Sequence, residues 1–108
     1  MTACVHFKKI ETTSSWSEIG FRFTPSPEYD GKTLTFTADI LNSTVRISQM
    51  IKTESQILVS SEVPVSSKGS FTISTILNST SEDLYCIFTV PPSNIGEYYL
   101  DNFKVTIQ

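Results

Sequence analysis

Apolar and polar residues alternate with a period of two along most of the chain, and no stretch keeps a helical period for long. In the clearest segment, Lys32–Asn42, the side chains of Leu34, Phe36, Ala38 and Ile40 fall on one face. Hydroxyl and acidic side chains fall on the other. This pattern predicts a strand with one face in a core and the other toward solvent or a ligand.

Eight segments of this kind follow one another at regular spacing. They are Thr2–Ile10, Trp16–Phe23, Lys32–Asn42, Val45–Thr53, Gln56–Val63, Ser70–Leu77, Asp83–Val90 and Glu97–Ile107. Prolines and tight-turn pairs separate them, because proline cannot donate to a strand ladder. The pattern predicts an all-β chain: a single antiparallel β-sandwich (jelly roll) of about eight strands, with residues 1–108 forming one domain.

The last segment contains a change of phase. Tyr98 and Leu100 share one face, whereas the apolar residues from Phe103 onward join that face only if the alternation slips by one residue at Asp101-Asn102. Such a slip is typical of a β-bulge, which re-aims side chains. A carboxylate in apolar company needs hydrogen bonds or a cation. Asp101 is therefore predicted either to cap backbone amides or to bind calcium.

Composition and charge argue against several classes of function. The net charge is −3, and the eight Lys and Arg residues are scattered along the chain. A nucleic-acid binder would show a basic stripe, and a membrane span would need a much longer apolar run. We therefore expect no nucleic-acid partner and no membrane insertion. A chain of 108 residues can bury a core without a metal or disulfide, so no cofactor is required for folding.

The two cysteines and the start of the chain bear on localisation. Cys86 shares a face with Leu84 and Phe88, which predicts a buried free thiol, whereas Cys4 faces away from its apolar neighbours. Free thiols are therefore favoured over a bond between Cys4 and Cys86. Met1 is followed by strand-like sequence without a signal-peptide pattern. The expectation is an excised domain or a small virion protein released by lysis, located outside the cell or on a virion surface.

Two segments resemble a known family. Gly31–Ala38 resembles the opening strand of jelly-roll carbohydrate-binding modules, and Gly96–Thr106 resembles their closing strand. The same architecture serves galactose-binding-like domains, adhesins and accessory domains of phage structural proteins. In this group the closing-strand aspartate often helps to hold a structural calcium, with a carboxylate near the end of the first strand. The resemblance implies Asp101 and Glu11 for these two positions, and both supply the oxygen ligands that calcium prefers.

Exposed aromatic rings are the side chains on which sugars stack. Trp16, the only tryptophan, has the parity of Glu18 and Arg22, whose charged groups could hydrogen-bond sugar hydroxyls. Tyr29 and Tyr99 are the other candidate platforms. Members of the family usually display two or more such rings, and a single tryptophan departs from that pattern. The alternative is that Trp16 caps the edge of the sandwich and the tyrosines only pack.

Catalysis has little support in the sequence. His6 is the only histidine, and no third group is indicated that would orient it against Cys4. No spacing selects a pair of carboxylates for glycoside hydrolysis, so a glycoside hydrolase is a remote alternative. The prediction is a non-catalytic glycan-binding or adhesion module. The main alternative is a virion structural protein that binds other virion proteins, such as a phage capsid decoration, head-fibre or tail accessory domain. The predicted partner is thus a glycan or a larger protein assembly, and an open strand edge would let two copies associate as a homo-oligomer.

Overall fold

The computed structural model describes residues 5–78 and 82–108, and within them the secondary structure is almost entirely strand. The strands are β1 (Val5–Lys9), β2 (Ser17–Phe23), β3 (Thr33–Ser43), β4 (Ile47–Lys52), β5 (Ile57–Val63), β6 (Gly69–Ile76), β7 (Leu84–Val90) and β8 (Gly96–Ile107). A single 3-10 turn, η1 (Pro27–Tyr29), lies between β2 and β3. Each predicted segment overlaps one strand, and β3 and β6 each extend one residue beyond their segments, so the all-β prediction is confirmed. The predicted start of the first segment, residues 2–4, lies outside the described residues.

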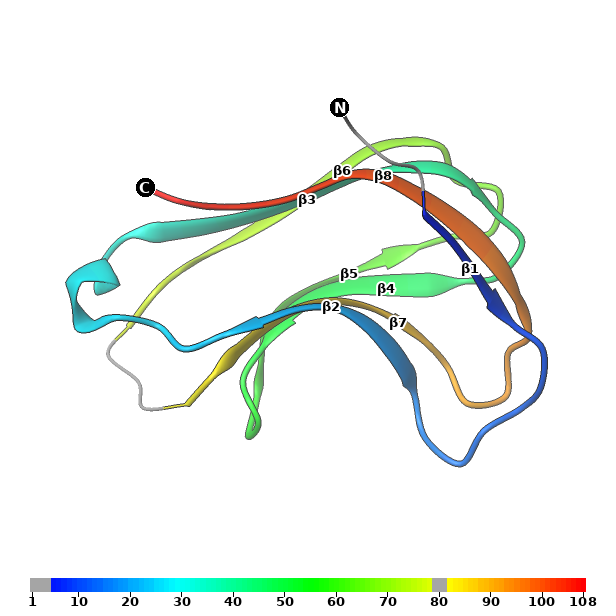
Figure 1. Ribbon diagram of the computed structural model, residues 1–108, viewed down its shortest axis with the longest axis horizontal. Helices are drawn as coiled ribbons and strands as arrows, with labels where there is room; N and C mark the ends of the chain where they lie inside the picture. The colour runs from blue at the N-terminus through cyan, green and yellow to red at the C-terminus, as the bar shows by residue number, and fades with distance from the viewer. Residues whose placement is uncertain (1–4, 79–81) are drawn as a thin grey trace.

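The strands form two antiparallel four-stranded sheets. One sheet has the order β1-β8-β3-β6, and the other has the order β2-β7-β4-β5. The two sheets stack as layers, and β8 returns to lie between β1 and β3 (Figure 1). Strands that are neighbours in a sheet are mostly distant in the sequence, which is the arrangement of a β-sandwich and confirms the predicted architecture.

The core lies between the two sheets and is built from the inward residues of both. Its largest fully buried apolar members are Phe36, Phe88, Leu34, Ile40, Ile47, Ile51, Leu84 and Leu100. The rings of Phe36 and Phe88 meet edge to face with their centroids 5.4 Å apart, a favourable arrangement of two aromatic quadrupoles. A polar side chain also lies in this core: Gln49 of β4 is fully buried, and its amide nitrogen donates to the carbonyl oxygens of Phe36 and Phe71 in the opposite sheet, at 3.1 Å each.

The predicted β-bulge is present in β8. Thr37 of β3 pairs with Lys104, but Asp39 pairs with Asp101, so one residue of β3 faces two residues of β8. Asn102 takes a left-handed backbone conformation with φ 50°, which asparagine tolerates better than most residues. The apolar residues beyond the bulge return to the core side. The slip of phase in the sequence therefore located an actual change of side-chain direction.

The β2-β7-β4-β5 sheet is bowed, and its concave side is turned away from the other sheet (Figure 1). The turn between β4 and β5 and the segment between β1 and β2 both extend past the sheet on this concave side (Figure 1). We call this surface the concave face. No helix among the described residues is long and apolar enough to cross a membrane.

Candidate functional site

A tyrosine between two cations lies on the concave face. Arg22 of β2 pairs with Tyr85 of β7, and Tyr85 pairs with Lys52 of β4, so the three residues form one row across three strands. The carbon centre of the Arg22 guanidinium lies 5.6 Å from the centroid of the Tyr85 ring, and the Lys52 ammonium nitrogen lies 5.7 Å from it. Both distances are within the range of cation–π attraction. We call these three residues the Tyr85 row.

Carboxylates hold each member of the Tyr85 row in place. Asp83 accepts a hydrogen bond from Nε of Arg22 at 2.9 Å, and Glu18 lies 3.7 Å from the Lys52 ammonium. The Tyr85 hydroxyl donates a hydrogen bond to Glu54 in the β4–β5 turn. The row is thus an aromatic ring surrounded by groups that donate and accept hydrogen bonds.

These contacts shift the ionisation of the row. The bond from the hydroxyl of Thr24 and then the bond from Arg22 lower the pKa of Asp83, so this carboxylate stays charged. The bond to Asp83 raises the pKa of Arg22, and the bond to Glu54 raises the pKa of Tyr85, which keeps its proton. At neutral pH the row therefore presents a fixed pattern of a cationic donor, a neutral phenol and anionic acceptors.

Two residues of β7 form the floor of the concave face beside the Tyr85 row. Ile87 and Thr89 point outward by register, yet their exposed fractions are only 3% and 2%. By register Thr89 lies between Glu18 and Ser48, and Ile87 lies between Gly20 and Met50. The Thr89 hydroxyl has no hydrogen-bond partner among the described residues, and a buried polar group without a partner is costly. Gly20 pairs with Ile87, and a side chain at this position would overlap backbone atoms of β7.

Trp16 lies at one end of the concave face, directly before β2. Its side chain is 49% exposed, so it does not cap the core. Glu18 and Arg22 follow it on the outward side of β2, as their shared parity predicted. The structure therefore keeps Glu18 and Arg22 on one side of the molecule, with the exposed Trp16 just before them in the chain.

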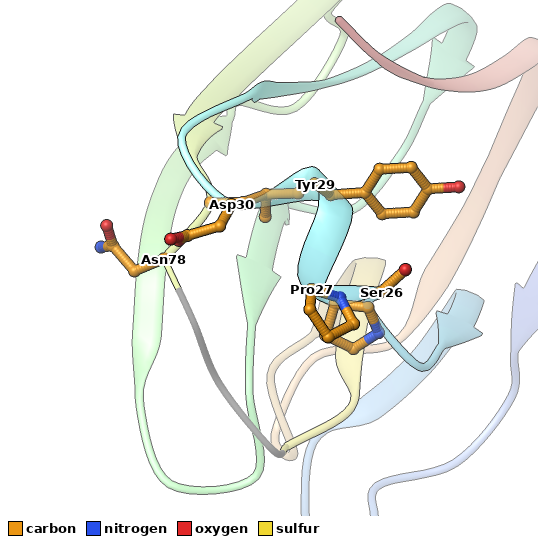
Figure 2. A pocket seen from close by; sticks show the side chains of 7 residues that line it. Ser26, Pro27, Tyr29, Asp30 and Asn78 are labelled. Carbon is orange, nitrogen blue, oxygen red and sulfur yellow. The ribbon is translucent and has the colours of Figure 1, made fainter.

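The two predicted tyrosines do not join them. Tyr99 lies on the outer surface of the other sheet, where its ring stacks on His6 with centroids 4.2 Å apart. Tyr29 belongs to η1 and packs against the core. Its ring points away from Asp30 and Asn78 (Figure 2), with which it lines a small pocket of about 90 Å³ at the end of the sandwich. Tyr99 thus lies on the sheet opposite Arg22.

The two carboxylates expected to bind calcium also lie apart. Val5 at the start of β1 pairs with Leu100, so Asp101 lies just beyond that end, whereas Glu11 follows the opposite end of β1. The carboxylate nearest Asp101 by register is Asp39, which accepts a 2.6 Å hydrogen bond from the side chain of Asn102. Within residues 5–78 and 82–108, no group of three or more His, Cys, Asp and Glu side chains is placed to hold a metal ion. Glu11 and Asp101 therefore do not fit one shared ion, and calcium itself stays a prediction.

The thiol and the imidazole do not form a nucleophilic pair. Cys86 is a buried free cysteine, and burial raises the pKa of its thiol to about 12, which keeps it protonated and unreactive. His6 is on the outside of the other sheet and hydrogen-bonds Glu97 at 2.7 Å. Cys4 lies outside the described residues. Cys86 thus behaves as the small core residue that its neighbours predicted.

Four important residues of the site were missed in the sequence: Tyr85, Lys52, Glu54 and Asp83. The sequence does contain a signal for Tyr85, because it alternates with the core residues Leu84 and Cys86 and so must face outward. Only the pairing of β7 with β2 and β4 shows that this outward tyrosine meets Arg22 and Lys52.

Comparison with known proteins supports the fold. No protein-family model matches the chain, and no curated protein matches it. A solved structure described as "CBM4 structure and function" superposes on 99% of this chain and 71% of its own, with a TM-score of 0.64 and 17% sequence identity. The chain is therefore a β-sandwich whose fold is similar to that of this solved structure. The resemblance seen in the closing strand is thereby confirmed at the level of the fold, and this structural similarity does not support the association with phage proteins.

Proposed function

We propose that the protein is a non-catalytic module that binds a glycan on its concave face, with the Tyr85 row at the centre of the site. The observation that supports this proposal is the partly exposed Tyr85 ring with Arg22 and Lys52 beside it and Glu54 on its hydroxyl. A sugar offers an apolar face of C–H groups and a rim of hydroxyls. A ring bordered by fixed donors and acceptors matches both features.

The charges of the face favour a ligand that is neutral. Arg22 and Lys52 each already lie beside a carboxylate, at 2.9 Å from Asp83 and 3.7 Å from Glu18, so an added acidic group would approach anions as well as cations. Repulsion of this kind discriminates against a charged partner. The proposed ligand is therefore a neutral oligosaccharide or polysaccharide.

Asp83 does not suit the proton-donating role in a glycosidase. Glycoside hydrolysis needs a carboxylic acid whose pKa is raised so that it can donate a proton. Asp83 has the opposite shift, because Thr24 and Arg22 stabilise its charged form. Binding without bond cleavage is the function that this arrangement supports.

Affinity electrophoresis in gels containing soluble xylan, glucan or galactomannan tests the proposal. We expect retardation by at least one polysaccharide, lost in Tyr85→Ala and largely kept in Tyr85→Phe, which retains the ring. Tyr99→Ala is the matched control, because it removes a partly exposed tyrosine from the opposite surface. Equal retardation of wild type and Tyr85→Ala would contradict the assignment of the site. A folded wild type retarded by none of the probes, and silent on a broad glycan array, would contradict the function.

A further inference from the structure

Arg22 is held at one end of its guanidinium only. Its Nε donates to Oδ2 of Asp83 at 2.9 Å, and Oδ1 of Asp83 accepts from the hydroxyl of Thr24 at 2.8 Å. Both oxygens of the carboxylate are therefore engaged, one by each partner. This chain of two hydrogen bonds fixes the direction in which the Arg22 side chain leaves β2.

The fixation matters because Arg22 is otherwise free to move. It lies on the edge strand β2, and 65% of its side chain is exposed. An arginine that becomes ordered on binding loses rotamer entropy, which weakens the complex. Asp83 and Thr24 remove part of that loss before the ligand arrives, as any preorganised site does.

The terminal nitrogens of Arg22 are left for a ligand. Within the part of the chain that the structure describes, they have no hydrogen-bond partner. The guanidinium centre lies 5.6 Å from the centroid of the Tyr85 ring. The guanidinium is planar, so its two terminal nitrogens point their N–H groups in parallel and match two neighbouring oxygens. A sugar ring in contact with the exposed part of Tyr85 would present such oxygens as a pair of adjacent hydroxyls.

We infer that Asp83 and Thr24 are positioning residues, which hold Arg22 so that its two terminal nitrogens bind two adjacent hydroxyl oxygens of the sugar on Tyr85. This inference rests on the proposed function. It adds that specificity in this site depends on a vicinal diol and that Asp83 acts through Arg22 without touching the ligand. An ordinary exposed ion pair would instead contribute little to stability and nothing to binding.

A double-mutant cycle separates these two cases. The probe is the polysaccharide that retards the wild type most, and dissociation constants come from the dependence of mobility on its concentration. Arg22→Ala and Asp83→Ala are each expected to weaken binding about tenfold, the size typical of hydrogen bonds to a charged group. The double variant is expected to be no weaker than Arg22→Ala alone, because Asp83 acts only through Arg22. Additive losses, or an Asp83→Ala variant with wild-type affinity, would overturn the inference.

Three further variants make the result specific. Arg22→Lys keeps the positive charge but lacks the two parallel terminal N–H groups, and it is expected to bind as weakly as Arg22→Ala. Thr24→Val, which leaves both charges in place, is expected to weaken binding in the same direction by a smaller factor. Thr24→Val also tests the positioning role if Asp83→Ala fails to fold. Glu97→Gln breaks the exposed ion pair with His6 on the opposite sheet and is expected to bind like wild type.

The two proposals fail in distinguishable ways. If no probe binds the wild type, both are refuted. If binding depends on Tyr85 but wild-type affinity persists in Arg22→Lys or in Asp83→Ala, the glycan site stands and the positioning role is refuted. If Thr24→Val and Glu97→Gln weaken binding equally, the loss is a general effect of surface substitutions and the inference is again refuted.

Discussion

The bulge in β8 offers a quantitative test of the fold. Asn102 makes two separable contributions there: its backbone tolerates φ 50°, and its side-chain nitrogen donates to Asp39 at 2.6 Å. Replacing Asn102 with alanine removes both, whereas replacing it with glycine removes only the hydrogen bond. The two variants therefore separate backbone strain from side-chain bonding at a single position.

The magnitudes follow from these two terms. An exposed hydrogen bond to a carboxylate is expected to contribute about 1 kcal/mol, the low end of its range. A left-handed conformation costs an alanine about 1 kcal/mol more than a glycine. We therefore expect Asn102→Gly to lower the free energy of unfolding by about 1 kcal/mol and Asn102→Ala by about 2 kcal/mol. In a domain of this size each kcal/mol corresponds to a fall in melting temperature of about 4 °C.

Urea unfolding followed by far-ultraviolet circular dichroism is the suitable assay, because Trp16 is half-exposed in the folded protein and is a weak fluorescence probe. Lys104→Ala, an exposed change two residues from Asn102 in β8, is the control and should stay within about 0.5 kcal/mol of wild type. Equal losses in the glycine and alanine variants would refute the argument from backbone strain. Wild-type stability in both would refute the role of Asn102 in the bulge.

Three further outcomes are expected. Burial raises the pKa of Cys86 from 9.0 to about 12, so above pH 9 the folded protein keeps a proton that the unfolded chain loses. The contribution of this group to stability is therefore full below about pH 9 and falls as the pH rises toward 12. The loss of stability over this range should be smaller in Cys86→Val. Gln49→Leu loses two hydrogen bonds but also removes a buried side-chain carbonyl oxygen without a partner. Urea unfolding should therefore show a change of about 1 kcal/mol or less in the free energy of unfolding of Gln49→Leu, and a loss of about 3 kcal/mol in Gln49→Ala. Calcium is expected to raise the melting temperature of wild type and Glu11→Gln but not of Asp101→Asn, because Asp39 and not Glu11 lies beside Asp101. A wild-type melting temperature that calcium leaves unchanged would contradict this prediction.

Local patterns were sufficient to predict the strands and the direction of most side chains. Within one strand, period-two alternation fixes which residues share a face, so the core residues of Lys32–Asn42 and the bulge at Asp101-Asn102 could both be located before any pairing was known. The same rule placed Glu18 and Arg22 on one side of β2. These features depend on residues that are close in the sequence.

The site could not be predicted in the same way, because it depends on which strands are neighbours. Arg22 and Tyr85 are paired across β2 and β7 although 63 positions separate them in the chain. Alternation says that Tyr85 and Tyr99 both face outward, but it does not say on which sheet. Alternation therefore could not show that Tyr99 and Arg22 lie on different sheets. It also could not show that Glu11 and Asp101 lie at opposite ends of β1, because strand register is a long-range property.

Curvature explains why outward residues of similar kinds form a candidate site on one sheet and not on the other. Both outer surfaces carry a partly exposed tyrosine in contact with a basic side chain: Tyr99 with His6 on one, Tyr85 with Arg22 and Lys52 on the other. On a convex surface side chains diverge, so each contact stays a local pair. On the concave face they converge, and Thr89 is only 2% exposed there. A ligand lying there can meet several strands at once, which is why the bowed sheet, and not the composition of its surface, determines where binding is expected.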